Sequence, residues 1–277
     1  LSEIKPVFYY QFQTPKVTAA AGIFTRDMMH DDDYSTAFFS ESERFFHNRM
    51  NGVLAQYNGK RDSYVEFVCD WEGMYSTLSR EKFRILLAGR HYLDTFYYGF
   101  NYSMFHYAGQ QGAPIENVVD LQLLTPCVGV RFNAFFDFDI KLGALLTAQR
   151  DRSFGHSWEK PCMGEFAFRI SRWGLSLDER LYVGDNIHPF FYGHELEDGT
   201  PLPYGRELYP AESFFRTDQK VYSRTALSYR RSFFDDTVSV RAEFAAHHDG
   251  TALGTQQMLV VGVKLLKTVY NSKNHKK

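Results

Sequence analysis

The stretch FFDFDIKLGALLTAQRD, residues 135–151, decides the fold class, because apolar and polar side chains alternate along nearly all of it. Every second residue from Phe136 to Ala148 is apolar, and the residues between them include Asp137, Asp139 and Lys141. Strict alternation is the period of a β-strand, whose successive side chains point to opposite faces. Strands usually run about 5–6 residues, and this one is about twice as long. Such a strand indicates a wall between an apolar phase and water.

The composition narrows the class of protein. The chain has 277 residues, 17% of them aromatic, yet its mean hydropathy is only −0.37. No apolar run approaches the roughly 20 residues of a spanning helix, which excludes a helical membrane protein but leaves a transmembrane barrel, because half of each barrel strand faces water. A net charge of −2 gives no reason to expect nucleic acid as a partner. Three widely spaced cysteines without a CxxC pair favour neither a metal site nor a disulfide framework.

The same alternation returns along the whole chain. It predicts strands at about 3–13, 16–24, 50–58, 62–71, 82–91, 95–107, 118–130, 135–149, 163–171, 174–183, 218–230, 236–247 and 255–268. No repeat, low-complexity tract or linker interrupts this pattern. We therefore expect a single domain over residues 1–277.

The links between these strands alternate between short and long. Short links such as TPK, NGKR and RW alternate with the long segments 25–49, 72–81, 108–117, 150–162 and 184–217. Short periplasmic turns opposite long extracellular loops are typical of outer-membrane barrels. Closing so long a meander into a barrel also removes its two exposed edges. The sequence therefore predicts an all-β, antiparallel up-and-down transmembrane β-barrel.

The predicted number of strands is odd. A bacterial single-chain barrel normally has an even number of strands, whereas the pattern above is odd. We infer that at least one N-terminal strand is absent from this chain or that the count is off by one. About 14 strands are expected in the intact protein, with 12 and 16 as alternatives.

Four blocks of the sequence carry a resemblance to a known group. They are YSTAFFSESERFFHNRMNGVLAQYNGK (34–60), CDW (69–71), YSMFHYAG (102–109) and FYGHELEDGTPLPYGRELYPAESFFRTDQKVYSRTALSYR (191–230). The chain resembles porin-like outer-membrane β-barrel proteins of Gram-negative bacteria, most of which lack an assigned substrate. The resemblance covers most of the chain, but it rests on loop and strand texture. It implies location in the bacterial outer membrane, in contact with lipid and lipopolysaccharide, and one or two further N-terminal strands.

The charged face of the predicted strands is expected to line a lumen. Its members are Asp62, Glu66, Asp70, Lys82, Arg84, Arg90, Asp137, Asp139, Lys141, Glu165, Arg169, Asp178, Arg180, Lys220, Arg224, Arg230, Arg241, Glu243 and Lys264. These side chains either pair across strands and plug the interior or line a water-filled passage, which becomes possible as strand number rises. The passage is the favoured interpretation, with segment 191–215 narrowing it or binding ligand at its mouth. The basic excess on the C-terminal strands predicts a weak preference for anions.

The apolar face is expected to contact lipid. Its clearest members are Phe136, Phe138, Ile140, Leu142, Val238, Val240 and Phe244. Aromatic residues near strand ends are expected at the membrane interfaces. These are Tyr57, Trp71, Tyr92, Trp173 and Tyr229.

The leading hypothesis is therefore a porin-like channel for passive diffusion or uptake of small polar solutes, without enzymatic activity, metal or cofactor. A second hypothesis is an outer-membrane barrel enzyme acting on lipid or glycan, suggested by His156, Ser157 and Glu159 in a loop. No third catalytic partner is evident there, so a solvated loop is favoured. A third hypothesis is a soluble carbohydrate-binding β-sandwich, against which the long strands and segregated loops argue.

Two further motifs have competing interpretations. Asp31, Asp32 and Asp33 could bind calcium through carboxylate oxygens, but they lack the glycine spacing and following glutamate of a calcium loop. A solvated acidic loop is favoured. His247 and His248 are expected to form a hairpin tip rather than a metal pair.

Overall fold

The structure, a computed structural model, describes residues 6–30, 33–112, 118–152, 157–187, 211–217, 219–235 and 237–263. Within them lies one antiparallel sheet of thirteen strands, in which each strand pairs with its neighbours in sequence. The strands are β1 (Phe8–Gln13), β2 (Val17–Thr25), β3 (Arg49–Asn58), β4 (Tyr64–Gly73), β5 (Lys82–Leu93), β6 (Phe96–Tyr107), β7 (Val119–Asn133), β8 (Asp137–Asp151), β9 (Cys162–Arg172), β10 (Leu175–Gly184), β11 (Val221–Phe233), β12 (Val238–His248) and β13 (Leu253–Val263). The predicted all-β, up-and-down antiparallel arrangement is confirmed.

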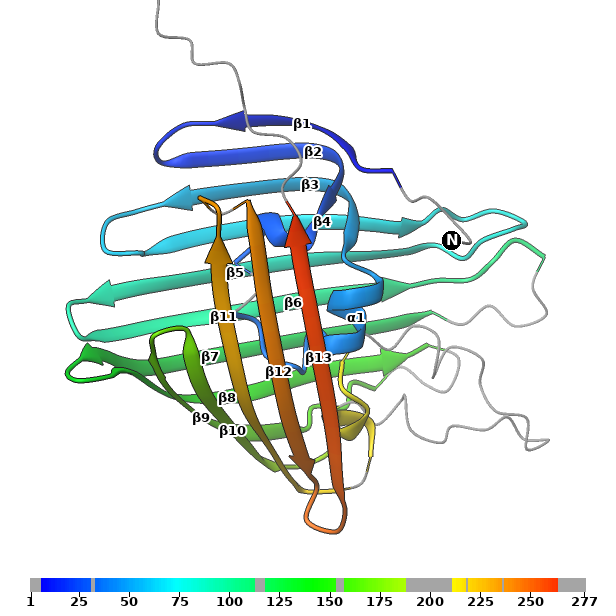
Figure 1. The fold of residues 1–277 in the computed structure, drawn as a ribbon. Coiled ribbons are helices and arrows are strands. Elements are labelled where there is room, and N and C mark those ends of the chain that lie inside the picture. The colour runs from blue at the N-terminus through cyan, green and yellow to red at the C-terminus, as the bar shows by residue number, and fades with distance from the viewer. Residues whose placement is uncertain are drawn as a thin grey trace, which may run out of the picture.

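The sheet coils back on itself but is not closed. Figure 1 shows β11–β13 crossing in front of β3–β8. Strands β1 and β13 are the two edges of the sheet, and they do not pair with each other within the described residues. Barrel closure and a fourteenth strand therefore stay predictions.

The two faces of the sheet differ as the alternation predicts. In β4, Glu66 and Val68 are buried, whereas their neighbours Val65 and Phe67 are exposed. In β8, Leu142 is 58% exposed and Leu145 is fully buried. We call the face that carries the buried residues the inner face and the opposite one the outer face. The residues predicted to contact lipid lie on the outer face of β8 and β12 or, for Phe136, directly before β8.

Residues 26–30 and 33–48, from the segment that links β2 to β3, fold against the inner face. This inward segment contains the 3-10 helix η1 (Arg26–Met28) and the helix α1 (Glu41–Phe46). Its residues Tyr34, Phe38 and Phe39 are buried and share the main core cluster with inner-face residues of β2–β5 and β7–β11 and with residues around the short helix η4 (Ser213–Arg216). The sequence predicted an extracellular loop here. Its position relative to a membrane stays a prediction, but the segment turns inward, because its apolar and aromatic side chains pack against an apolar stretch of the inner face.

The links between strands are segregated as predicted, with one difference. Links 14–16, 59–63, 94–95, 134–136, 173–174 and 234–237 are short, whereas 26–48, 74–81, 108–118, 152–161 and 185–220 are longer. The link between β12 and β13, residues 249–252, is short although it lies at the end with the long links. None of the described helices combines the length and the apolar character needed to cross a membrane.

Candidate functional site

Most charged residues predicted to line a lumen lie on the inner face. They are Glu66, Asp70, Lys82, Arg84, Arg90, Asp137, Asp139, Lys141, Glu165, Arg169, Asp178, Arg180, Arg224, Arg230, Arg241 and Glu243. Asp62 is different, because its φ of 61° places it in the turn before β4. Lys220 precedes β11, and its side chain is 75% exposed beside Asp185. The expected strand positions of these two residues are wrong, and Lys264 lies outside the described residues.

The first anchor of the inward segment is the buried carboxylate of Glu66 on β4. It accepts hydrogen bonds from the Tyr34 hydroxyl at 3.0 Å and from the His30 backbone N–H at 2.9 Å. The Gln56 side-chain amide donates a third hydrogen bond at 2.6 Å. A buried carboxylate needs such donors to offset the loss of water. Glu66 therefore ties the inward segment to the wall.

The second anchor joins Asp33 to β4 and β5. The Arg90 guanidinium lies 2.8 Å from one carboxylate oxygen of Asp33, and the Tyr64 hydroxyl donates to the other at 2.5 Å. The interpretation of Asp33 as part of a solvated acidic loop is therefore wrong. Asp31 and Asp32 lie outside the described residues.

A third contact places two arginines over one aromatic ring. The guanidinium carbon of Arg26 lies 4.3 Å from the centre of the Phe39 ring, and that of Arg84 lies 5.3 Å from it. Glu43 pairs with Arg26 at 3.2 Å, and Glu72 pairs with Arg84 at 3.1 Å. Burial and the nearby Arg84 charge lower the pKa of the Arg26 guanidinium, whereas Glu43 opposes that shift. Both cations are thus held by carboxylates and by the face of an aromatic ring.

Beyond these anchors the inner face is not filled. A cavity of about 330 Å³ lies between the inward segment and β8–β12. We call it the chamber. Its arginines are Arg44, Arg169, Arg172, Arg180, Arg224, Arg230 and Arg241, and its carboxylates are Glu41, Asp137, Asp178 and Glu243. Arginines outnumber carboxylates, so the chamber carries net positive charge.

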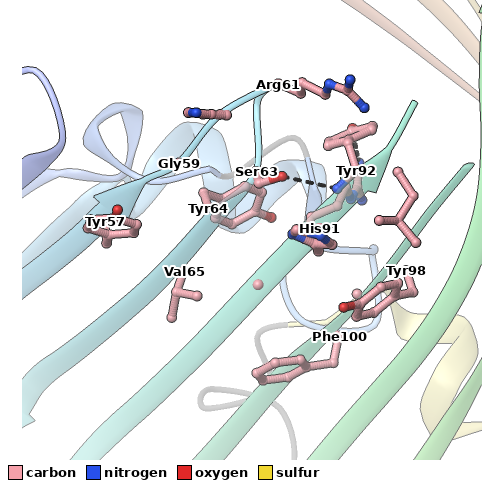
Figure 2. Close-up of a pocket in the computed structure, with 15 residues that line it drawn as sticks. Tyr57, Gly59, Arg61, Ser63, Tyr64, Val65, His91, Tyr92, Tyr98 and Phe100 are labelled. Atoms are coloured by element: carbon pink, nitrogen blue, oxygen red, sulfur yellow. Dashed lines mark hydrogen bonds between the residues drawn. The ribbon is translucent and has the colours of Figure 1, made fainter. Parts of the chain in front are cut away.

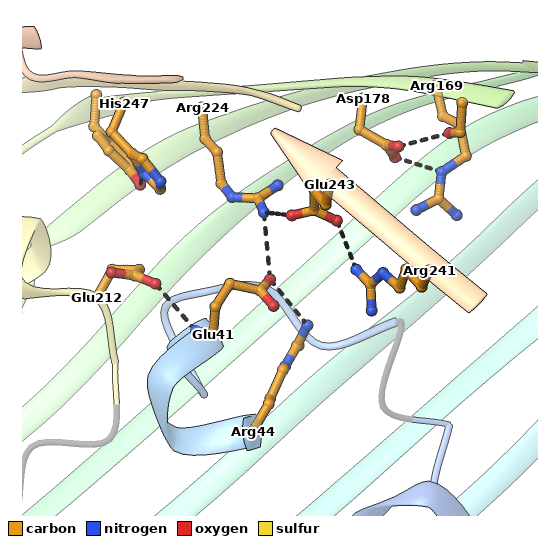
Figure 3. A network of polar contacts seen from close by, with 11 residues as sticks. Glu41, Arg44, Arg169, Asp178, Glu212, Arg224, Arg241, Glu243 and His247 are labelled. Atoms are coloured by element: carbon orange, nitrogen blue, oxygen red, sulfur yellow. Dashed lines mark hydrogen bonds and ion pairs between the residues drawn. The ribbon is translucent and has the colours of Figure 1, made fainter. Parts of the chain in front are cut away.

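Figure 3 shows how α1 is tied to the chamber wall. The Glu243 carboxylate on β12 accepts from Arg224 at 2.5 Å and from Arg241 at 2.7 Å. Arg224 also reaches Glu41 of α1 at 3.4 Å, and Glu41 lies 3.7 Å from Arg44. The network joins residues of two wall strands to a helix from a distant part of the chain. This network holds the inward segment beside the chamber, and the chamber itself stays unfilled.

Two other cavities share residues with the chamber. A larger one, of about 810 Å³, shares Glu41, Arg44, Arg230 and Arg241 with it. A smaller one shares Arg169, Asp178 and Arg180. The polar cavities are therefore adjacent along the inner face, with shared arginines at both boundaries.

The outer face carries a separate hollow of about 630 Å³. Figure 2 shows its lining side chains Tyr57, Val65, Tyr98 and Phe100 on β3, β4 and β6. These side chains are 39–55% exposed, and the turn 59–63 borders the hollow. Because its walls are mainly apolar and it lies on the outer face, it is not part of the charged interior.

Several predicted roles change in the structure. Tyr92, expected at a membrane interface, is buried and packs against Tyr97 with ring centres 5.2 Å apart. His247 is not at a hairpin tip, because it lies within β12 and contacts the Tyr222 hydroxyl at 2.5 Å through Nδ1. Trp71 and Trp173 are exposed at strand ends, as predicted.

The loop considered for catalysis shows no constellation of catalytic groups among its described residues. Glu159 forms an isolated backbone bridge with Gln149, and Ser157 is exposed. His156 lies outside the described residues. The part of the chain that the structure describes has no group of three or more His, Cys, Asp or Glu side chains placed to hold a metal ion.

Sequence reasoning missed the residues that the inward segment brings to the interior, above all Glu41, Arg44 and Arg26. One local signal was present, because Ser40 and Glu43 have the Ser-x-x-Glu spacing of a helix start. In the structure the Ser40 hydroxyl does accept from the Glu43 backbone N–H at 3.0 Å. The aromatic run YSTAFF before it was the second signal that this loop is buried.

No family model matches this sequence, and neither characterised proteins nor solved structures gave a significant match. The resemblance to porin-like outer-membrane proteins therefore stays a prediction.

Proposed function

We propose that this chain forms a channel in the bacterial outer membrane through which small polar solutes diffuse, narrowed by the inward segment. The observation that carries the proposal is the contrast between the two faces of one continuous sheet. The inner face holds charged side chains around adjacent cavities, whereas the outer face exposes apolar side chains along its strands.

The outer face supports placement in lipid. Leu142, Leu259 and Val261 are 58%, 69% and 59% exposed, respectively, and all three point away from the charged interior. Exposed apolar patches larger than a few hundred Å² mark interaction with a membrane or a partner. Backbone groups of paired strands are satisfied by their neighbours, as lipid requires. Membrane lipid and lipopolysaccharide are the proposed partners of this face.

The inner face supports passage of solutes rather than a sealed core. A sealed interior would pack to the density of an organic crystal, with few voids larger than a water molecule. The chamber of about 330 Å³ and its neighbour of about 810 Å³ are much larger than that. The inward segment borders both, so it sets the width of the passage. No observation on the described residues favours an enzyme.

The test is reconstitution of the full chain into a planar lipid bilayer. We expect stepwise conductance from the wild type. Glu41→Gln should raise the mean conductance, because it weakens the contacts of α1 with Arg224 and Arg44. Glu159→Gln, which alters an exposed loop residue, is the matched control and should leave conductance unchanged. Folded, inserted protein without conductance in either the wild type or Glu41→Gln would contradict the proposal.

A further inference from the structure

The wall of the chamber contains two pairs of arginines directly opposite each other. Arg180 on β10 pairs in register with Arg224 on β11, and Arg230 on β11 pairs in register with Arg241 on β12. Like charges directly opposite across a strand pair destabilise a sheet. Two such pairs on one cavity wall require counter-charge from somewhere.

The protein supplies only part of that counter-charge. Glu243 lies between Arg224 and Arg241 and pairs with both. Among the described residues, no carboxylate lies within ion-pair distance of Arg180 or of Arg230. The charges of Glu165 and Asp178 act on Arg180 from longer range, and Arg230 is exposed. Each arginine pair therefore has one member with a carboxylate partner and one member without.

Two buried hydrogen-bond donors of the chamber-lining arginines also lack a partner. Nη1 of Arg180 and Nε of Arg224 are buried and have no hydrogen-bond partner in the described structure, although Arg180 does interact with the Tyr182 hydroxyl. A buried donor without a partner costs about 1–3 kcal/mol, and more when it is charged. Nearly all buried polar groups have a partner, so exceptions call for a missing water or ion. Here the excess charge is positive, which favours an anion.

The positions of Arg180 and Arg230, the two arginines without a carboxylate in ion-pair contact, suggest two binding positions rather than one. Arg180 lines both the chamber and the smaller cavity, whereas Arg230 lines both the chamber and the larger cavity. Arg224 and Arg230 on β11 are six residues apart, which is about 20 Å at the rise of a strand. A solute that crosses the chamber would meet, at each boundary, one arginine that has no carboxylate in ion-pair contact.

We propose that the chamber binds small oxyanions, namely carboxylates or phosphate, through Arg180 and Arg230. The planar guanidinium donates paired hydrogen bonds that match the geometry of carboxylate and phosphate oxygens. The chamber volume of about 330 Å³ is at the lower end of small-molecule sites, which span about 300–1,000 Å³. As a statement about transported solutes this inference rests on the proposed channel, but the binding itself does not.

The test measures binding without transport. Trp173 lines the chamber, so its fluorescence can report occupancy. The full chain in detergent is titrated with sodium phosphate and, separately, with sodium succinate, at an ionic strength held constant with sodium chloride. We expect a saturable change in the wild type that is absent from Trp173→Phe.

Arg230→Gln should weaken the binding that Trp173 reports at least tenfold, or about 1.4 kcal/mol. Isothermal titration calorimetry, which does not depend on the position of Trp173, should show a loss of the same size for Arg180→Gln. The matched control is Arg231→Gln, because Arg231 is next to Arg230 on β11 but points to the outer face. Its affinity should stay within twofold of the wild type. Circular dichroism checks that each variant retains its strands.

The wild-type titration alone can overturn the inference, since a response equal to that of sodium chloride would show that no oxyanion site exists. An equal loss in Arg231→Gln and Arg230→Gln would also overturn it. Conductance without saturable binding would leave the proposed channel standing and contradict the oxyanion site. Binding without conductance would support the site and contradict the channel.

Discussion

The inner face of β3–β8 and the inner face of β9–β12 follow the same alternation but end in different surroundings. On β3–β8, residues such as Leu54, Val68, Leu86 and Leu123 are almost fully buried in the main core cluster with the inward segment. On β9–β11, Met163, Tyr182 and Tyr222 still belong to that cluster, but other inner-face positions of β9–β12 are occupied by the arginines that line the chamber. The difference shows that alternation decides which face a side chain occupies, while the covering segment decides whether that face is dry.

The chemistry of the side chains explains why the two regions differ. Burial of the apolar inner-face residues beneath Phe39 and Tyr34 stabilises the folded state, because it removes apolar surface from water. Arginines opposite arginines are costly to bury unless carboxylates pair with them, as Glu41 and Glu243 do with the buried Arg224. The inward segment therefore seals the first region. In the second region the inward segment contacts the wall through the ion pair between Glu41 and Arg224, and the chamber beside this contact stays open.

The strongest way to break this comparison is to remove packing from the sealed region. Phe39 is fully buried beneath Arg26 and Arg84. We expect Phe39→Ala to lower the free energy of unfolding by about 3–5 kcal/mol, through lost burial and the cavity left behind. Denaturant unfolding followed by circular dichroism measures the loss. Phe45→Ala is the control, because Phe45 is 56% exposed in the same segment, and a similar loss there would show that this core is not tightly packed.

The comparison of the two inner regions also assumes that the outer face contacts the same surroundings, namely lipid, behind both of them. Ile140 lies on the outer face of β8, directly opposite Phe168 near the middle of β9. If that face contacts lipid, Ile140→Arg should destabilise the folded protein by about 2–4 kcal/mol, because a charge at the membrane midplane is poorly solvated. Leu253→Arg, at the start of β13, should cost about 0–1 kcal/mol because it lies near an interface. Reversible unfolding from lipid vesicles gives both values, and equal costs would exclude the lipid assignment.

Gly143→Arg, at an inner-face position of the same strand β8, is not a useful control for Ile140→Arg. A Cβ atom at Gly143 would lie 3.1 Å from a carboxylate oxygen of Glu165 and 3.1 Å from the Pro126 carbonyl oxygen. This inward position has no free space for a long side chain. Any loss of stability there would report crowding and not polarity.

The smallest expected effect concerns the helix that borders the chamber. The Ser40 hydroxyl caps α1, which presents Glu41 to Arg224. Ser40→Ala should lower the free energy of unfolding by about 1 kcal/mol, because one backbone N–H at the helix start loses its partner. Ser40→Thr, which keeps the hydroxyl, should stay close to the wild type in the same unfolding measurement. A larger loss for Thr than for Ala would mean that packing, and not capping, governs this position.

The fold could be predicted well from local pattern, with errors where backbone geometry or packing overrides it. All thirteen strands were expected, and most of their ends agree to within a few residues. The start of β4 was placed too early, because the positive φ angles of Arg61 and Asp62 belong to a turn. Tyr92 was assigned to a membrane interface from its place near a strand end, but alternation puts it on the inner face, where it packs against Tyr97.

The candidate site was predicted only in part. The charged wall residues followed from alternation, so Arg180, Arg224 and Glu243 were all expected to face inward. Glu41, the partner of Arg224 on the inward segment, was not expected, because it belongs to a segment that was interpreted as an extracellular loop. The sequence of a loop does not show by itself which surface the loop will cover.

The sequence by itself determined the class of fold, the number of described strands and the face on which each strand residue lies. These are local properties, because the period of a strand repeats every two residues and any window of a few residues displays it. Only the tertiary structure decided which part of the inner face is sealed and which part remains a chamber. That outcome depends on contacts such as Arg224 with Glu41, which are 183 residues apart in sequence, and on the register that sets arginine opposite arginine. Burial and net charge at such a place are sums over distant segments, and no local pattern contains them.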